Sequence, residues 1–200
     1  MEEFRSSYEI ASDFINDNPN WVLHWRNPIQ LFESLGWEVI PYKKSEYEKL
    51  SIEAYSSYKH NNFYILYCED NYVTRTTYNL HHEGGHVISA HPILFPEVLC
   101  KSSKDTEKHY LESSATIVGR NVFLPAFIID YIIKNVNNID KNCIKEYFRE
   151  TYKVSKHYIN VRFEYLEKDL KNMRYPREIY KEAAKEYGKF ANWYLKKYHK

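Results

Sequence analysis

The sequence is poor in the features that mark secreted, cross-linked or membrane-embedded proteins. Only three of its 200 residues are cysteine (Cys68, Cys100 and Cys143), and none has a partner at CxxC spacing. This pattern predicts neither a disulfide framework nor a thiolate zinc site. No run of about 18 apolar residues is present, so no membrane-spanning helix is expected. The N-terminal MEEFRSSYEI lacks the apolar stretch of a secretory signal, and we expect a cytoplasmic protein.

The formal net charge of +1 hides an uneven distribution of charged residues. Residues 1–140 contain 12 Lys and Arg against 19 Asp and Glu, whereas residues 141–200 contain 16 against 8. A basic C-terminal third is compatible with nucleic-acid binding. Interleaved charges such as EKDLK and KEAAKEYGK are also typical of solvated helix faces. We therefore expect at most weak, non-specific binding of nucleic acid.

Apolar spacing and helix-breaking residues predict two helices followed by a small sheet. Residues 2–17 have the spacing of an amphipathic helix that ends at Asn18-Pro19. Asn27 and Pro28 are expected to cap and begin the second helix, which Gly36 ends. Residues 37–75 then predict a mostly antiparallel sheet, in which WEVIPY and NNFYILYCED are clear strands, SIEAYSSY is ambiguous and Asn61-Asn62 can turn.

Helical patterns return after the sheet. One helix is expected from Thr76 or Thr77 to His91-Pro92, where proline stops it. LFPEVLCKSSKD has no clear period and is expected to form a loop. The next helix is expected to run from a cap at Asp105 or Thr106 to Leu124-Pro125, and further helices follow to His199.

This order of elements predicts an α+β fold, with a small sheet beside a helical core. The chain has 200 residues, of which 44% are hydrophobic, and this is enough to form one full hydrophobic core. We expect an N-terminal helical segment (1–25), a core that carries the motif described next (26–135) and a helical C-terminal region (136–200). Within the last region, residues 143–166 have a helix-turn-helix-like pattern, followed by a long terminal helix.

The stretch most informative about chemistry is His82-Glu83-Gly84-Gly85-His86, an HExxH motif. On a helix, side chains four residues apart project from one face, so His82 and His86 could hold one zinc ion. The Glu83 carboxylate lies beside the first histidine, where it could accept a proton from an activated water without binding the metal. Because the chain has nine histidines, two of them could have this spacing by chance. Whether the motif is a metal site therefore depends on the surrounding residues.

A catalytic zinc needs a third protein ligand and one open position. The metzincin pattern fails because Ser89 and Pro92 stand where it needs glycine and a ligand. We favour Glu112 on a second helix, since Ala115, Thr116 and Gly119 would give that helix a small-residue face against which the motif helix could pack closely. The alternatives are Glu97, Asp105, Glu107, His91 and His109. His81 is expected to point away from the metal, and His91 to act in packing or capping.

Several short motifs, in order, resemble the ImmA/IrrE family of zinc metallo-endopeptidases. The residues that carry the resemblance, between about 28 and 166, are NPIQLFESLGWEVIPY, Arg75-xxxx-Leu80-x-His82-Glu83-x-Gly85-His86, Glu112-Ser113-Ser114-Ala115, Phe123-Leu124-Pro125, Tyr152-Lys153-Val154-Ser155, Arg162 and Leu166. Two positions depart from the family pattern. Gly84 replaces a bulky apolar residue, which would loosen that helix face, and Ser114 replaces a second glutamate, which leaves Glu112 as the acidic match.

The resemblance implies a gluzincin-like hydrolase with zinc held by His82, His86 and Glu112, and with Glu83 as general base. It also implies a protein substrate, most plausibly a helix-turn-helix repressor of a mobile element, and hence an anti-repressor role. Tyr78, one turn before His82, is a weak candidate for stabilising the oxyanion. The alternative is a non-catalytic regulator that binds DNA or the repressor, because residues 143–166 combine the helix-turn-helix-like pattern with basic residues.

Overall fold

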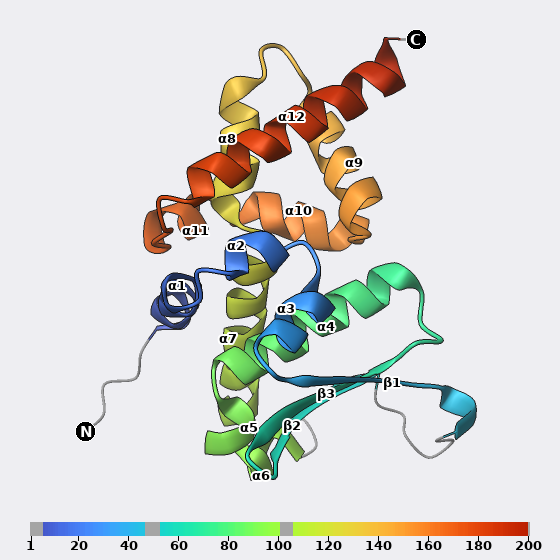
Figure 1. Ribbon diagram of the computed structural model, residues 1–200, viewed down its shortest axis with the longest axis vertical. Helices are drawn as coiled ribbons and strands as arrows, with labels where there is room; N and C mark the ends of the chain where they lie inside the picture. Colours follow the sequence, from blue (N-terminus) through green and yellow to red (C-terminus); the bar gives the residue numbers. More distant parts are fainter. Residues whose placement is uncertain (1–5, 47–52, 101–105, 200) are drawn as a thin grey trace.

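The computed structural model describes residues 6–46, 53–100 and 106–199, and it confirms the α+β class (Figure 1). The helices and strands are α1 (Ser7–Asp17), α2 (Trp21–His24), α3 (Pro28–Ser34), β1 (Glu38–Tyr42), the 3₁₀ turn η1 (Lys44–Glu46), β2 (Ala54–Lys59), β3 (Asn62–Cys68), α4 (Val73–Ile88), α5 (His91–Leu94), α6 (Pro96–Cys100), α7 (Thr106–Phe123), α8 (Ala126–Asn135), α9 (Lys141–Tyr152), α10 (Lys156–Glu164), α11 (Leu166–Asn172) and α12 (Ile179–Tyr198).

The sheet has the order β1-β3-β2, with β3 in the centre. β2 pairs antiparallel with β3, whereas β1 pairs parallel with it, so the sheet is mixed. The hairpin turn lies at His60 and Asn61, whose φ angles of 49° and 65° suit a two-residue loop. The predicted turn at Asn61-Asn62 is therefore wrong by one residue, because Asn62 already pairs with Lys59.

The first helices begin and end near the predicted residues. Ser6 and Glu9 form a capping box at the start of α1, which ends before Asn18; residues 2–5 of the predicted helix lie outside the described residues. At α3, the Asn27 side chain accepts a hydrogen bond from the backbone N–H of Gln30. Gly36 follows this helix with a φ of 78°, in the left-handed region that glycine tolerates.

The helix that carries the HExxH motif differs from its prediction at both ends. α4 starts at Val73 and ends at Ile88, and Ala90 then turns the chain with a left-handed φ of 56°. Pro92 therefore does not stop this helix but sits in the first turn of α5, where its missing N–H has no cost. The predicted loop that follows contains α6. α7 matches its prediction from Thr106 onward, and the alternative cap at Asp105 lies outside the described residues.

In Figure 1, α7 runs along the long axis and joins the two halves of the molecule. In the lower half α4 packs against α7, β2 and β3, and in the upper half α12 packs against α8 and α9. The predicted helix-turn-helix-like pattern corresponds to α9 and α10, separated by Lys153 in a left-handed conformation. Among the described helices none alone is long and apolar enough to cross a membrane; α7 and α8 meet that test only as a pair, across a 49° bend.

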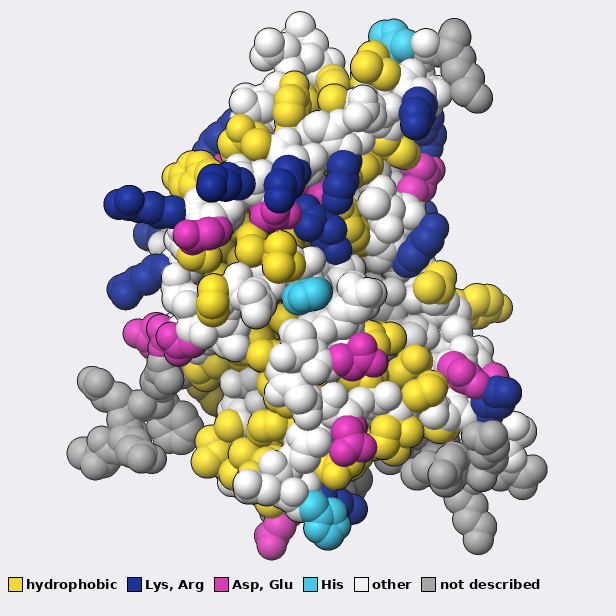
Figure 2. Space-filling view, viewed as in Figure 1, with side chains coloured by type: hydrophobic (Ala, Val, Ile, Leu, Met, Phe, Trp, Pro, Cys, Tyr) yellow, Lys and Arg dark blue, Asp and Glu magenta, His cyan; other side chains and the backbone are white. Residues whose placement is uncertain are grey.

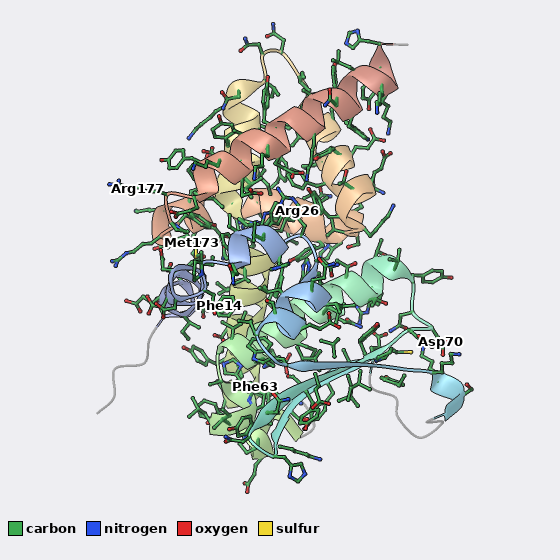
Figure 3. The ribbon with its side chains drawn as sticks, viewed as in Figure 1. Phe14, Arg26, Phe63, Asp70, Met173 and Arg177 are labelled. Carbon is green, nitrogen blue, oxygen red and sulfur yellow. The ribbon has the colours of Figure 1, made fainter. Side chains whose placement is uncertain are left out.

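Two ion-pair networks hold the C-terminal helices to the rest of the chain. Arg26, labelled in Figure 3, lies just after α2 and pairs with Glu182 and Glu186 of α12 at 2.9 and 3.0 Å. Asp169 of α11 is fully buried and accepts a bidentate pair of hydrogen bonds from Arg120 of α7, both of 2.9 Å. Arg162 of α10 binds the same carboxylate. These contacts fix α10 and α11 beside α7, where they form one side of the cleft described below.

Candidate metal centre

Helices α4 and α7 approach each other so closely that their backbones touch at two glycines. A Cβ atom on Gly85 would lie 2.0 Å from the Ala115 carbonyl oxygen, and one on Gly119 would lie 2.2 Å from the His81 carbonyl oxygen. The predicted small-residue packing is confirmed at these positions. Gly84 instead faces the rings of Phe32 and Phe123, which occupy the space that a larger side chain would need. The helix face at Gly84 is therefore filled rather than loosened.

This crossing brings together the three residues predicted as metal ligands. His82 Nε2 lies 2.8 Å from Glu112 Oε2 and 3.2 Å from His86 Nε2, and His86 Nε2 lies 3.6 Å from Glu112 Oε2. Donor atoms about 2.0–2.1 Å from a tetrahedral zinc are separated by roughly 3.3 Å. The three observed separations bracket this value. The two nitrogens and one oxygen thus converge on a point that one small divalent cation could occupy.

The other ring nitrogen of each histidine has its own hydrogen-bond partner. His82 Nδ1 lies 3.2 Å from Thr116 Oγ1, and this hydroxyl donates to the Glu112 carbonyl oxygen at 2.9 Å. The hydroxyl hydrogen is therefore in use, so Thr116 Oγ1 must accept from His82 Nδ1–H. His86 Nδ1 lies 2.9 Å from the Nδ1 of buried His91. Donation from His86 Nδ1–H would leave both Nε2 atoms free to bind a metal.

Burial and hydrogen bonding set the charge of the groups around the centre. Without a metal, hydrogen bonds from the Nε2–H groups of His82 and His86 hold the pKa of Glu112 well below its usual value, so this carboxyl is ionised; a bound metal would take the place of these Nε2 protons. Burial lowers the pKa of His91 to about 3, and a neutral His91 has a ring nitrogen that can accept from His86. Burial likewise lowers the pKa of His81 to about 3. The His81 ring points away from the centre and bonds through Nδ1 to the Tyr158 hydroxyl at 3.0 Å.

Two of the three donors, His82 and Glu112, line a cleft of about 820 Å³ between α4, α7, the start of β2, α10 and α11, whereas His86 is buried. We call it the metal cleft; its chemically active lining residues include Tyr78, His82, Glu83, His109, Glu112 and Tyr165. Glu83 therefore shares the open space beside the donors, as a general base must. The Tyr78 ring stacks on the His82 ring at a centroid distance of 6.0 Å, which places it at the edge of the centre.

The alternative ligands have different positions. Among the described residues Glu97, Glu107 and His109 are outside the donor cluster, although His109 lines the metal cleft; Asp105 is outside the described residues. His91 contacts a predicted ligand but on the side away from the cleft. Sequence reasoning missed this role of His91 and that of Thr116. The available signal was spacing, since Thr116 lies four residues after Glu112 and so on the same helix face.

No protein-family model matches this sequence, and no curated protein matches it. The assignment of a function therefore depends on the geometry of the centre.

Proposed function

We propose that this protein is a zinc-dependent metallo-endopeptidase. The observation that carries the proposal is the convergence of His82 Nε2, His86 Nε2 and one Glu112 carboxylate oxygen, with every pair within 4.8 Å, at the wall of an open cleft. Two histidines and one glutamate are a known ligand set of catalytic zinc in peptidases. Glu83, which is outside the donor cluster, lines the same cleft and supplies the base that hydrolysis needs.

The residues present fit zinc rather than a harder cation. Imidazole nitrogen suits zinc, whereas Mg²⁺ and Ca²⁺ prefer oxygen ligands. When bound, zinc would polarise the scissile carbonyl and lower the pKa of an attacking water to about 7. Glu83 accepts the proton of that water and passes it to the leaving amine. Thr116 and His91 hold the two imidazoles in the orientation that this chemistry requires.

We further propose membership of the ImmA/IrrE family and a cytoplasmic protein substrate, most plausibly a helix-turn-helix repressor. The sequence resemblance suggests both the family and the substrate. The positions in the fold of the residues that carry this resemblance support the proposal. Arg75 lines the metal cleft and Arg162 is fully buried against Asp169. Gly84 stands where the family pattern has a bulky apolar residue, and the rings of Phe32 and Phe123 fill the space that such a side chain would occupy.

The alternative is a non-catalytic regulator that binds DNA or the repressor. Lys and Arg side chains gather over the upper half of the view in Figure 2, which favours some electrostatic binding. The pattern that suggested specific DNA binding is less favourable, because Arg162 of α10 is turned inward and cannot reach a phosphate. Weak, non-specific binding remains our expectation.

The test is a comparison of zinc content and cleavage in four variants. Wild type should hold one zinc ion per chain, and His82→Ala, His86→Ala and Glu112→Ala should each lose it, because two ligands alone bind weakly. Glu107→Ala, on the same helix as Glu112, is the matched control and should keep the metal. If Glu107→Ala loses zinc while Glu112→Ala keeps it, the third ligand is misassigned.

Glu83→Gln separates catalysis from binding. It should keep both zinc and fold, yet slow cleavage by about 10²–10⁴-fold, since an amide cannot accept the proton. The assay uses as candidate substrates the helix-turn-helix proteins encoded beside this gene, and fragments are identified by mass spectrometry. Wild type should make one defined cut. Equal cleavage by Glu83→Gln, or an intact repressor that is bound equally by both proteins, would contradict a peptidase.

A further inference from the structure

A second cavity of about 420 Å³ adjoins the metal cleft. We call it the basic pocket; the residues that define it are Arg75, Arg120, Arg162, His157, Tyr78 and Tyr158. The two cavities share Arg75, Tyr78, Thr116, Arg120 and Val161 as lining residues. Tyr78 stacks on the His82 ring and Thr116 lies 3.2 Å from His82 Nδ1, so the basic pocket lies directly beside the candidate metal centre.

The two cavities differ in the charge of their walls. The metal cleft has mixed walls, with the carboxylates of Glu53, Glu83 and Glu112 beside the basic side chains of Arg75, Arg120 and Lys168. In contrast, no carboxylate from the described parts of the chain lines the basic pocket, although three guanidinium groups and one imidazole do. Ser155 and His157 place the first turn of α10 at this wall, so the positive end of that helix dipole faces the same space. The basic pocket is therefore built for a negative group.

Among the described residues, the ion pairs of the three arginines leave one positive charge without a counterion. Arg120 and Arg162 share the single carboxylate of Asp169. Burial, followed by the hydrogen bond to Asp169, raises the pKa of Tyr8 to about 12, so the Tyr8 hydroxyl in this network is neutral. Arg162 also donates to the Leu124 carbonyl and the Asn121 side-chain oxygen, which carry no charge. Arg75 has Glu53 as its partner.

Two carboxylates thus face three guanidinium groups, and a positive charge in a partly enclosed site attracts an anion more strongly than one in bulk water. We propose that the basic pocket is a specificity subsite for an acidic side chain, Asp or Glu, next to the scissile bond of the peptide substrate. This inference rests on the proposed peptidase function. Arg75 and His157 are both exposed and line the basic pocket, so they would contact the substrate carboxylate directly. The buried Arg120 and Arg162 would attract it through their positive charge without contact.

The experiment measures binding rather than turnover, so that it does not depend on finding the natural substrate. The probes are short alanine-based peptides with a zinc-binding hydroxamate at either end and one Glu or Gln at a varied position. Their affinity for the zinc-loaded protein is measured by titration calorimetry. At one position Glu should bind about tenfold more tightly than Gln, as a charge-assisted hydrogen bond in a partly buried site would give.

The variants assign this preference to the basic pocket. Arg75→Gln and His157→Gln are exposed substitutions that should each reduce the preference for Glu by about two- to fivefold, without loss of zinc. Lys168→Gln, which removes a positive charge from the metal cleft but not from the basic pocket, should leave the preference intact. Equal binding of Glu and Gln peptides, no binding of any hydroxamate, or a preference unchanged in Arg75→Gln and His157→Gln would overturn the proposal. A clear preference with no cleavage of any protein would instead contradict only the peptidase function.

Discussion

At the residue scale, the hydroxyl of Thr116 determines which nitrogen of His82 is available to a metal. It donates to the carbonyl oxygen of Glu112 and accepts from His82 Nδ1, so it links two proposed ligands on different helices. His91 has the same relation to His86. Each contact fixes the orientation of a ring whose rotation by a few tens of degrees would move its Nε2 away from the other donors.

Thr116→Val should therefore lower zinc affinity by about 10–100-fold, since it keeps the shape of the side chain but removes the hydroxyl. Zinc affinity is measured by competition with a chromophoric chelator. Thr77→Val is a matched control, because Thr77 also bonds to the carbonyl four residues before it, at 2.9 Å on α4, but contacts no predicted ligand. Equal zinc affinities for the two variants would show that the contact with His82 has no effect on the metal.

Residue identities and spacing were sufficient to predict that His82, His86 and Glu112 lie close together, because helical intervals place such side chains on facing surfaces of two helices. The partners of the histidines could not be predicted in the same way. Thr116 and His82 are 34 residues apart, and a threonine has many possible hydrogen-bond partners. His91 reaches His86 only because Ala90 turns the chain with a left-handed φ, and alanine carries no signal for that conformation.

At the scale of whole elements, the centre depends on how closely α4 and α7 cross. Glycine inside a helix costs roughly 1 kcal/mol relative to alanine, and Gly85 and Gly119 are placed where a Cβ atom would overlap the opposite backbone. The close crossing sets the distance between the histidines of α4 and the carboxylate of α7. The two glycines thus contribute to the metal centre without touching it.

Gly85→Ala should destabilise the protein by about 1–3 kcal/mol, as overpacking does, and should also weaken zinc binding because the helices must separate. Gly188→Ala in α12 is the control: a Cβ atom there meets nothing within 4 Å, so helix propensity should stabilise the protein by up to about 1 kcal/mol. Urea unfolding of the metal-free proteins and a zinc titration check both parts. A Gly85→Ala protein as stable as Gly188→Ala would contradict close packing at this crossing.

Elements with clear start or stop signals were predicted well, and short elements without such signals were not. α7 is limited by Pro125, and α3 begins with Asn27-Pro28. In contrast, α5 has four residues and α6 has five, which is too few to show a helical period. α4 starts three or four residues before its predicted start for a similar reason. Val73 is exposed, and the first turn of the helix has no apolar pattern.

At the scale of the molecule, the Asp169 network links the helices that surround the metal cleft. Tyr8 of α1, Arg120 of α7 and Arg162 of α10 all bind the Asp169 carboxylate of α11. The contacting residues are up to 161 positions apart in the chain, so no local pattern in the sequence could predict them. The Asp169 carboxylate offsets one of the two positive charges of Arg120 and Arg162 beneath the basic pocket, and the stability of this region should depend on it.

Acid should remove this contribution. Burial alone would raise the pKa of Asp169, but hydrogen bonds from Arg120 and the charge of Arg162 outweigh it, so the pKa is lowered on folding. A carboxyl with a lowered pKa stabilises the folded state fully above its unfolded pKa of about 3.9, and this contribution is lost as the pH falls through the lower folded value. Asp169→Asn, which lacks the charge at every pH, should therefore differ from wild type most at neutral pH.

We expect Asp169→Asn to lower the free energy of unfolding by roughly 3–5 kcal/mol at pH 7, because it leaves two buried guanidinium groups without their counterion. The difference should narrow as the pH is reduced below about 4. Urea unfolding in the presence of a chelator, from pH 7 to pH 3, separates this effect from loss of zinc. Asp130→Asn is the control for the loss of any carboxylate. Asp130 forms an ion pair with Lys134, one turn away on α8, and removing this pair should cost less than about 0.5 kcal/mol. A difference for Asp169→Asn that is constant from pH 7 to pH 3 would show that its charge does not stabilise the fold, and that the two arginines are held by their neutral acceptors instead.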